Sequence, residues 1–101
     1  MEKDDVVRLL SALSDPIRID IVFLLGVHDQ LSAGQIVQHF RRSQPAISHH
    51  LKVLKDARLL YSEKRGQEVY YWLDWHYTAT CLRALLQSID ECPVALRQKQ
   101  Q

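Results

Sequence analysis

The sequence has few cysteines, no long apolar run and none of the common enzyme motifs. Its two cysteines, Cys81 and Cys92, are too few for a disulfide framework. No apolar stretch approaches the roughly 20 residues of a membrane-spanning helix. The acidic start, MEKDD, lacks the basic and then apolar pattern of a secretory signal. No Gly-rich phosphate loop, nucleophile elbow or complete metal-catalytic triad is present. We therefore expect a cytoplasmic protein that does not insert into membranes and is not an enzyme.

Positive charge is concentrated in one part of the chain. The 101 residues include 13 basic and 12 acidic ones, for a formal charge of +1. Residues 41–65 hold seven of the basic residues and only two of the acidic ones. A nearly neutral protein with one basic segment suggests a localised site for a polyanion. A charged surface that is simply solvated gives the same composition, so charge alone does not decide between the two.

Apolar residues recur at helical spacing in five segments of the chain. The predicted helices span residues 3–13, 16–25, 32–40, 43–57 and 75–92. The second is apolar almost all round and is predicted to be central to the core. Pro16 and Pro45 suit first turns, Gly26 is predicted to end the second helix, and Pro93 to end the last. The tail RQKQQ is predicted to be frayed.

Between the fourth and last helices the pattern changes to that of strands. The segment RLLYSEKRGQEVYYWLD is rich in aromatic and branched residues and is interrupted by KRGQE. This predicts two strands joined by a short hairpin that contains Gly66. The short turn between the third and fourth helices is typical of a helix-turn-helix. We therefore predict a mainly α fold with a β-hairpin, a winged helix-turn-helix in which residues 1–101 form one DNA-binding domain.

The fourth predicted helix has one apolar and one polar side. Ile47, Leu51 and Leu54 form the apolar stripe when residues are placed 100° apart. The opposite side carries Gln44, Ser48, Lys52 and Lys55, flanked by His49 and Asp56. His49 is predicted to face outward, whereas His50 falls at the edge of the stripe and is predicted to be half-buried and structural.

This polar side suits the major groove of DNA. Gln bonds adenine, Ser addresses base edges or phosphates, and Lys reaches guanine or phosphate. The helix N-terminus favours phosphate, and Arg41 and Arg42 flank that end of the helix. An ordinary solvated helix face is the alternative, but such a face usually mixes Glu with Lys, and Asp56 is the only acid here. The candidate DNA-binding residues are Arg41, Arg42, Ser43, Gln44, Ser48, His49, Lys52 and, at the hairpin tip, Lys64 and Arg65.

Four segments together resemble the ArsR/SmtB-type winged-helix repressors of bacteria. They are LSDPIRIDIVFLL, LSAGQIVQHF, SQPAISHHLKVLKDARLL and EKRGQEVYYWLD, in the order and spacing of that family. The resemblance implies a homodimer that pairs through its first and last helices and binds an imperfect palindrome of double-stranded DNA. It also implies a transcriptional repressor, often of its own promoter.

Many members of that family release DNA when a metal binds, and the matching positions differ here. A Cys-x-Cys box would fall on Ser32 and Gly34, neither of which is a soft-metal ligand. The Asp-x-His of the zinc-type members is matched by Asp74 and His76. Their later ligands would fall near Gln87 and Asp90, or Glu91 if the register slips, and Gln is a poor zinc ligand. Capping of the last helix by Asp74 is the favoured explanation of this pair, and a metal sensor is the alternative.

A thiol sensor is a further alternative. Cys81 and Cys92 are separated by about 16 Å along one helix, too far for a disulfide within the chain. Cys81 is predicted to be in the core and Cys92 to be the more reactive thiol. The chain looks most like the small metal-independent autorepressors of the family, which have no cofactor and for which a partner protein is a candidate regulator. A winged helix that binds only proteins is the remaining alternative, which the basic recognition face disfavours.

Overall fold

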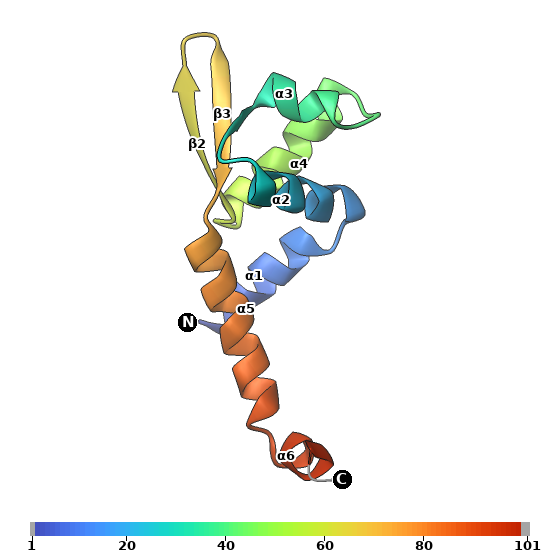
Figure 1. Ribbon diagram of the computed structural model, residues 1–101, viewed down its shortest axis with the longest axis vertical. Coiled ribbons are helices and arrows are strands. Elements are labelled where there is room, and N and C mark those ends of the chain that lie inside the picture. The colour runs from blue at the N-terminus through green and yellow to red at the C-terminus, as the bar shows by residue number, and fades with distance from the viewer. Residues whose placement is uncertain (1, 100–101) are drawn as a thin grey trace.

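A computed structural model describes residues 2–99 of the chain. The predicted order of helices and hairpin is confirmed, with two short elements added (Figure 1). The elements are α1 (Lys3–Leu13), α2 (Pro16–Val27), β1 (Leu31–Ser32), α3 (Ala33–Gln38), α4 (Gln44–Asp56), β2 (Leu60–Arg65), β3 (Glu68–Leu73), α5 (Trp75–Asp90) and α6 (Pro93–Lys99). Gln100 and Gln101 of the predicted frayed tail lie outside the described residues.

The wing, formed by β2 and β3, contributes two strands of a three-stranded antiparallel sheet of order β1-β3-β2. The hairpin pairs β2 with β3, and its turn holds Gly66 at φ 64°, a left-handed conformation that glycine adopts without strain. The additional strand β1 pairs Leu31 with Tyr71 and anchors the base of the wing to the start of α3. Periodicity did not predict β1 because two residues are too few to show alternation.

The predicted end of the second helix and the predicted frayed tail were wrong. The helix α2 continues through Gly26 to Val27, and the amide of His28 still donates to the carbonyl of Leu24 at 3.1 Å. Gly26 has no left-handed φ, so it does not form the glycine stop that was expected there. Pro93 does follow the end of α5, but it then begins the helix α6. Proline is favoured at a first helical position, and residues 97–99 of the tail are therefore helical and not frayed.

The hydrophobic core lies where α1, α2, α3, α4 and the base of the sheet meet. Its fully buried large side chains are Leu9, Ile21, Ile36, Ile47, Leu51, Leu54, Leu59 and Cys81. The helix α2 is central to the core, as predicted, but only one of its sides is buried. One side of α2 packs inward, but Phe23 is 67% exposed and Val27 is 80% exposed on the other. Apolar side chains therefore lie on both the buried and the exposed side of this helix.

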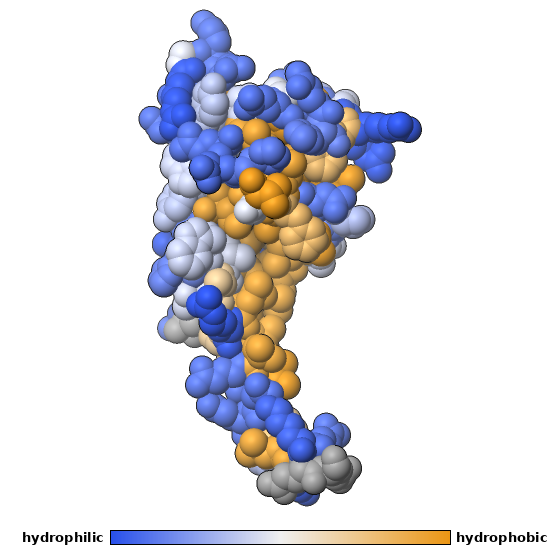
Figure 2. Space-filling view, in the orientation of Figure 1, coloured by the Kyte–Doolittle hydropathy of each residue, from blue (hydrophilic) through white to orange (hydrophobic). Residues whose placement is uncertain are grey.

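The helix α5 extends from the helical body, so that the molecule measures 55 × 25 × 22 Å (Figure 1). Figure 2 shows apolar surface that continues from the helical body along this helix. Leu82, Leu86 and Ile89 are between 39% and 59% exposed there. Among residues 2–99, no helix has the length and hydropathy to cross a bilayer.

Candidate nucleic-acid interface

Local sequence fixes where α4 begins. The Oγ of Ser43 accepts a hydrogen bond from the amide of Ala46 at 3.3 Å, and Pro45 occupies the first turn. A hydroxyl cap satisfies an amide that has no partner within the helix, and proline there loses no hydrogen bond. In α3, Ser32 and Gln35 form a reciprocal capping box at 2.8 and 3.2 Å. Both helices of the helix-turn-helix are thus capped by their own serines.

The two sides of α4 are separated as the periodicity predicted. Ile47, Leu51 and Leu54 are at most 1% exposed. The outward side chains are exposed, and they include Gln44, Ser48, His49, Lys52 and Lys55. The two adjacent histidines differ as expected, because His49 is exposed and His50 is half-buried. Packing of the apolar stripe therefore orients the polar side toward solvent.

The predicted DNA-binding residues outside α4 lie at the same end of the molecule. The loop of residues 39–43, which carries Arg41 and Arg42, and the hairpin tip, which carries Lys64 and Arg65, are both at the end remote from α6 (Figure 1). All four basic side chains are exposed. Hydrophilic surface covers this end in Figure 2. These four positive charges come from separate parts of the sequence but lie toward the same end of the molecule.

Two of the basic residues predicted to contact DNA, Lys52 and Arg65, interact with neighbouring side chains of the same chain. Lys52 Nζ lies 2.9 Å from Asp56 Oδ2. Arg65 donates to Gln30 Oε1 at 2.8 Å and to Glu63 Oε2 at 3.0 Å, and its guanidinium lies 4.8 Å from the ring centre of Tyr70. No local pattern predicted the contact between Arg65 and Gln30, since the two residues are 35 positions apart. These three neighbours restrict the position of the Arg65 side chain on the wing.

A polar contact behind the recognition surface joins three helices. Arg18 of α2 donates from Nε to the carbonyl of Ala12 in α1 at 2.6 Å, and its Nη1 lies 3.1 Å from His50 Nδ1 in α4. Because arginine is only a donor, His50 Nδ1 is the acceptor, which places the ring hydrogen on Nε2. The sequence predicted a structural His50 but not its partner.

The carboxylate of Asp15 holds the start of α2, next to this contact. It accepts hydrogen bonds from the amides of Ile17 at 2.9 Å and Arg18 at 3.3 Å. Partial burial raises the pKa of Asp15, but the hydrogen bonds from the amides of Arg18 and Ile17, together with the positive charge of Arg18, outweigh it. The pKa of Asp15 is therefore lowered from its ordinary value of 3.8.

The residues considered as sensors have structural contacts. Ser32 is 2% exposed and caps α3. Asp74 caps α5 by accepting from the amide of Tyr77 at 3.1 Å, as the favoured explanation predicted, while His76 is exposed beside Trp75. Within residues 2–99, no three His, Cys, Asp or Glu side chains are grouped closely enough to hold a metal ion. These positions in one chain offer no assembled ligand set.

The cysteines lie in different surroundings, and no disulfide joins them. Cys81 is fully buried in the core, as predicted. Cys92 is exposed, and its Sγ lies 3.2 Å from the carbonyl oxygen of Ser88, one turn earlier in α5. Only Cys92 is therefore accessible to a reagent in the folded chain.

Comparison with known proteins decides the family. Residues 15–62 match the sequence profile described as "Bacterial regulatory protein, arsR family". The chain is 44% identical over 84 residues to the transcriptional repressor SdpR of Bacillus subtilis strain 168, covering 83% of this chain and 92% of that protein. The chain belongs to the ArsR family. The ArsR-family arsenical resistance operon repressor of Staphylococcus xylosus is 36% identical over 77 residues, covering 76% of this chain and 73% of that protein.

Solved structures agree on the ArsR-family fold. A crystal structure of an ArsR family transcriptional regulator superposes with a TM-score of 0.82, covering 90% of this chain and 92% of the other. Their sequences are 19% identical, so this likeness concerns the fold alone. The matched profile spans α2, α3, α4 and the start of β2. It therefore includes the whole helix-turn-helix, with the polar side of α4. In ArsR-family terms, α4 is the recognition helix and the β2–β3 hairpin is the wing.

Proposed function

We propose that this ArsR-family transcriptional repressor binds an imperfect palindrome as a homodimer, with residues 1–101 as one winged-helix DNA-binding domain. The exposed polar side of α4 carries this proposal. It presents hydrogen-bonding side chains and lysines, with Asp56 as its one acidic residue. Exposed basic residues of the 39–43 loop and the wing lie at the same end of the molecule. The proposed contacts are Arg41, Arg42, Ser43, Gln44, Ser48, His49, Lys52, Lys64 and Arg65.

These residues divide into two roles in the proposal. Gln44, Ser48 and His49 lie in the first turns of α4, where short side chains let the helix enter the major groove and read base edges. Arg41, Arg42, Lys64 and Arg65 provide phosphate contacts, which fix the register but carry no sequence information. Binding is expected to weaken steeply as salt rises, because each neutralised phosphate releases counterions.

Exposed apolar side chains on the first helix and the long helix α5 support the homodimer. Val7 and Leu10 on α1 and Leu82 and Leu86 on α5 are between 39% and 59% exposed. Apolar surface of this extent on a small chain favours association. A two-fold axis through these helices places two copies of α4 on successive major grooves, about 34 Å apart.

We further propose that the repressor is cytoplasmic and metal-independent, represses its own promoter, and answers to a partner protein if it has a regulator. The similarity to SdpR, whose name describes a transcriptional repressor, supports repression. The engagement of Ser32 and Asp74 in helix caps supports independence from metal. A metal or thiol sensor at Asp74 and His76 or at Cys81 and Cys92 is the alternative, and neither pair has an observation that favours it.

Selection of binding sites from random duplexes, followed by footprinting on the chain's own promoter, tests the proposal. We expect a recovered site with inverted symmetry. The double variant Ser48→Ala/His49→Ala is expected to lose discrimination between that site and random DNA while keeping its affinity for random DNA.

A matched control replaces an exposed serine and histidine elsewhere, in the variant Ser88→Ala/His28→Ala. It is expected to discriminate like the native protein. Equal loss of affinity for both DNAs in the first variant would argue against base recognition by Ser48 and His49. A native chain that shows no preference among duplexes at moderate salt would refute the proposed function, and would favour a winged helix that binds proteins.

A further inference from the structure

We infer that Arg18 is a positioning residue that sets the angle of the recognition helix α4 relative to α1. The inference rests on the proposed function, because it concerns how two copies of α4 are held for DNA. Arg18 projects from α2, and its guanidinium hydrogen bonds with Ala12 of α1 and His50 of α4. It acts through His50, which lies on the inner edge of α4.

The geometry of the contact favours a positioning role. The Nε of Arg18 donates to the carbonyl of Ala12, in the last turn of α1, and Nη1 donates to His50 Nδ1. These donors belong to one rigid planar guanidinium, so the two bonds fix the direction of α4 relative to the end of α1. The amide of Arg18 is itself held by the Asp15 cap. One side chain therefore joins α1, α2 and α4.

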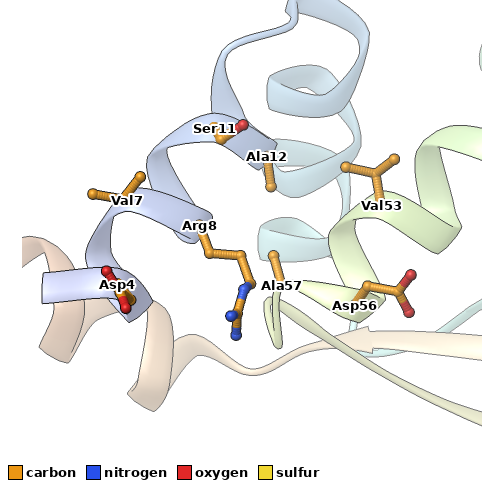
Figure 3. Close-up of a pocket in the computed structure, with 8 residues that line it drawn as sticks. All are labelled: Asp4, Val7, Arg8, Ser11, Ala12, Val53, Asp56 and Ala57. Carbon is orange, nitrogen blue, oxygen red and sulfur yellow. The ribbon is translucent and has the colours of Figure 1, made fainter. Parts of the chain in front are cut away.

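Apolar packing leaves the relation between α1 and α4 incompletely fixed. Ala12 of α1 and Ala57, which directly follows α4, are each 3% exposed. Both line an open hollow of about 520 Å³ between the two helices (Figure 3). Figure 3 shows Arg8 of α1 extending into this hollow and Val53 of α4 on its opposite side. This hollow opens to solvent, so side chains do not fill the space between these parts of α1 and α4, and packing there resists a tilt less than a close-packed contact would.

The hydrogen bonds of Arg18 lie close to this gap. Ala12 lines the hollow and also supplies the carbonyl that Arg18 binds, and His50 is one turn before Val53 in α4. The directional hydrogen bonds of Arg18 thus lie next to this unfilled space. In the proposed homodimer, α1 is at the interface, so the angle between α1 and α4 sets the separation of the two recognition helices. We infer that loss of this contact reduces base discrimination more than it reduces phosphate binding.

Three variants separate positioning from stability. Arg18→Lys keeps the positive charge but has no planar pair of donors. His50→Leu removes the acceptor with a side chain of similar size, and His50→Asn keeps an acceptor oxygen close to the position of Nδ1. We expect the ratio of operator affinity to random-DNA affinity to fall about tenfold in Arg18→Lys and in His50→Leu, comparable to one lost base contact. We expect His50→Asn to retain most of the ratio.

The double variant Arg18→Lys/His50→Leu identifies the pair. If the two residues act through one contact, discrimination falls no further than in either single variant. Affinity for random DNA is expected to stay near the native value in every variant, measured well below each thermal unfolding midpoint. Full discrimination by folded Arg18→Lys and His50→Leu would overturn the inference. A native protein that itself fails to discriminate would instead refute the proposed function.

A measurement without DNA tests the inference separately. Spin labels are placed at Lys3→Cys in α1 and Gln44→Cys in α4, both exposed sites, on a Cys92→Ser background. Labelled protein is diluted into unlabelled protein so that only distances within one chain are observed. We expect the α1–α4 distance distribution to broaden in Arg18→Lys and His50→Leu and to stay narrow in His50→Asn. An unchanged width in folded Arg18→Lys would overturn the inference whatever the DNA result.

Discussion

Lys52 Nζ lies 2.9 Å from Asp56 Oδ2, one turn away on α4. Asp56, the one acidic residue of the recognition helix, therefore forms an ion pair with Lys52, which we propose to contact DNA. Both side chains are largely exposed, so the ion pair itself contributes little to stability. The main effect of Asp56 is to reduce the positive charge that α4 presents to DNA. A substitution that removes this negative charge is therefore expected to increase DNA affinity.

Asp56→Asn is expected to tighten DNA binding severalfold. The substitution removes a negative charge beside the proposed phosphate contacts and frees Lys52 to reach the backbone. The gain is expected to be similar for operator and random DNA, since phosphate contacts carry no sequence information. Affinity measured by fluorescence anisotropy over a range of salt is expected to show a slope steeper by about one counterion.

The matched control is Asp90→Asn. Asp90 also pairs with a lysine, Lys99, at 2.8 Å, but at the opposite end of the molecule. It makes the same change in net charge and is expected to leave DNA affinity nearly unchanged. An equal gain in both variants would show that net charge, and not the position of Asp56, governs binding.

Leu86→Glu is expected to dissociate the proposed homodimer. Leu86 is 59% exposed on the apolar surface of α5, and a carboxylate there would have to be desolvated when two copies pair. Analytical ultracentrifugation is expected to show a monomer, and operator affinity is expected to fall at least tenfold because one half-site is bound alone. Gln87→Glu adds the same charge at the adjacent exposed position as a control. An unchanged dimer in Leu86→Glu would place the interface elsewhere.

Asp15→Asn is expected to alter how stability depends on pH. The pKa of Asp15 is lowered in the folded chain, because hydrogen bonds from Arg18 and Ile17 outweigh its burial. Its charged form therefore stabilises the fold at pH values above the ordinary value of 3.8, and this contribution is lost as the pH falls below it. Asparagine keeps an oxygen for the cap but does not titrate.

Urea denaturation of both proteins over the acid range measures this effect. The difference in free energy of unfolding between the native chain and Asp15→Asn is expected to be constant near neutral pH and to shrink as the pH falls through the lowered pKa of Asp15. Asp15→Ala, which removes the cap itself, is expected to be less stable than Asp15→Asn at every pH. A difference that does not change with pH would contradict a lowered pKa.

His76→Ala is expected to leave metal binding and repression unchanged. Asp74 Oδ1 already accepts from the amide of Tyr77, and no group of three potential ligands is gathered within residues 2–99. Calorimetric titration with zinc of the native chain and of His76→Ala is expected to give the same weak heats. Tight binding that disappears in His76→Ala would establish the metal-sensor alternative and overturn metal independence.

The local sequence was sufficient to predict the recognition helix. The period of Ile47, Leu51 and Leu54 determined which side of α4 is buried, and Ser43 determined where the helix begins. It also predicted the hairpin turn at Gly66 and the cap at Asp74. Each of these depends on residues within one or two turns of each other, which is the range over which helix and turn preferences act.

Only the tertiary structure decided what these elements touch. The pairing of β1 with β3, the contact of Arg65 with Gln30 and the link from Arg18 to His50 all join residues more than 30 positions apart. The partly exposed outer side of α2 is a second example, because an almost wholly apolar helix sequence does not show which of its sides remains in contact with solvent. Local preference fixes the conformation of each segment and which side of it is apolar. Which segments meet, and how much of each apolar side they cover, depends on how the helices pack around one small core.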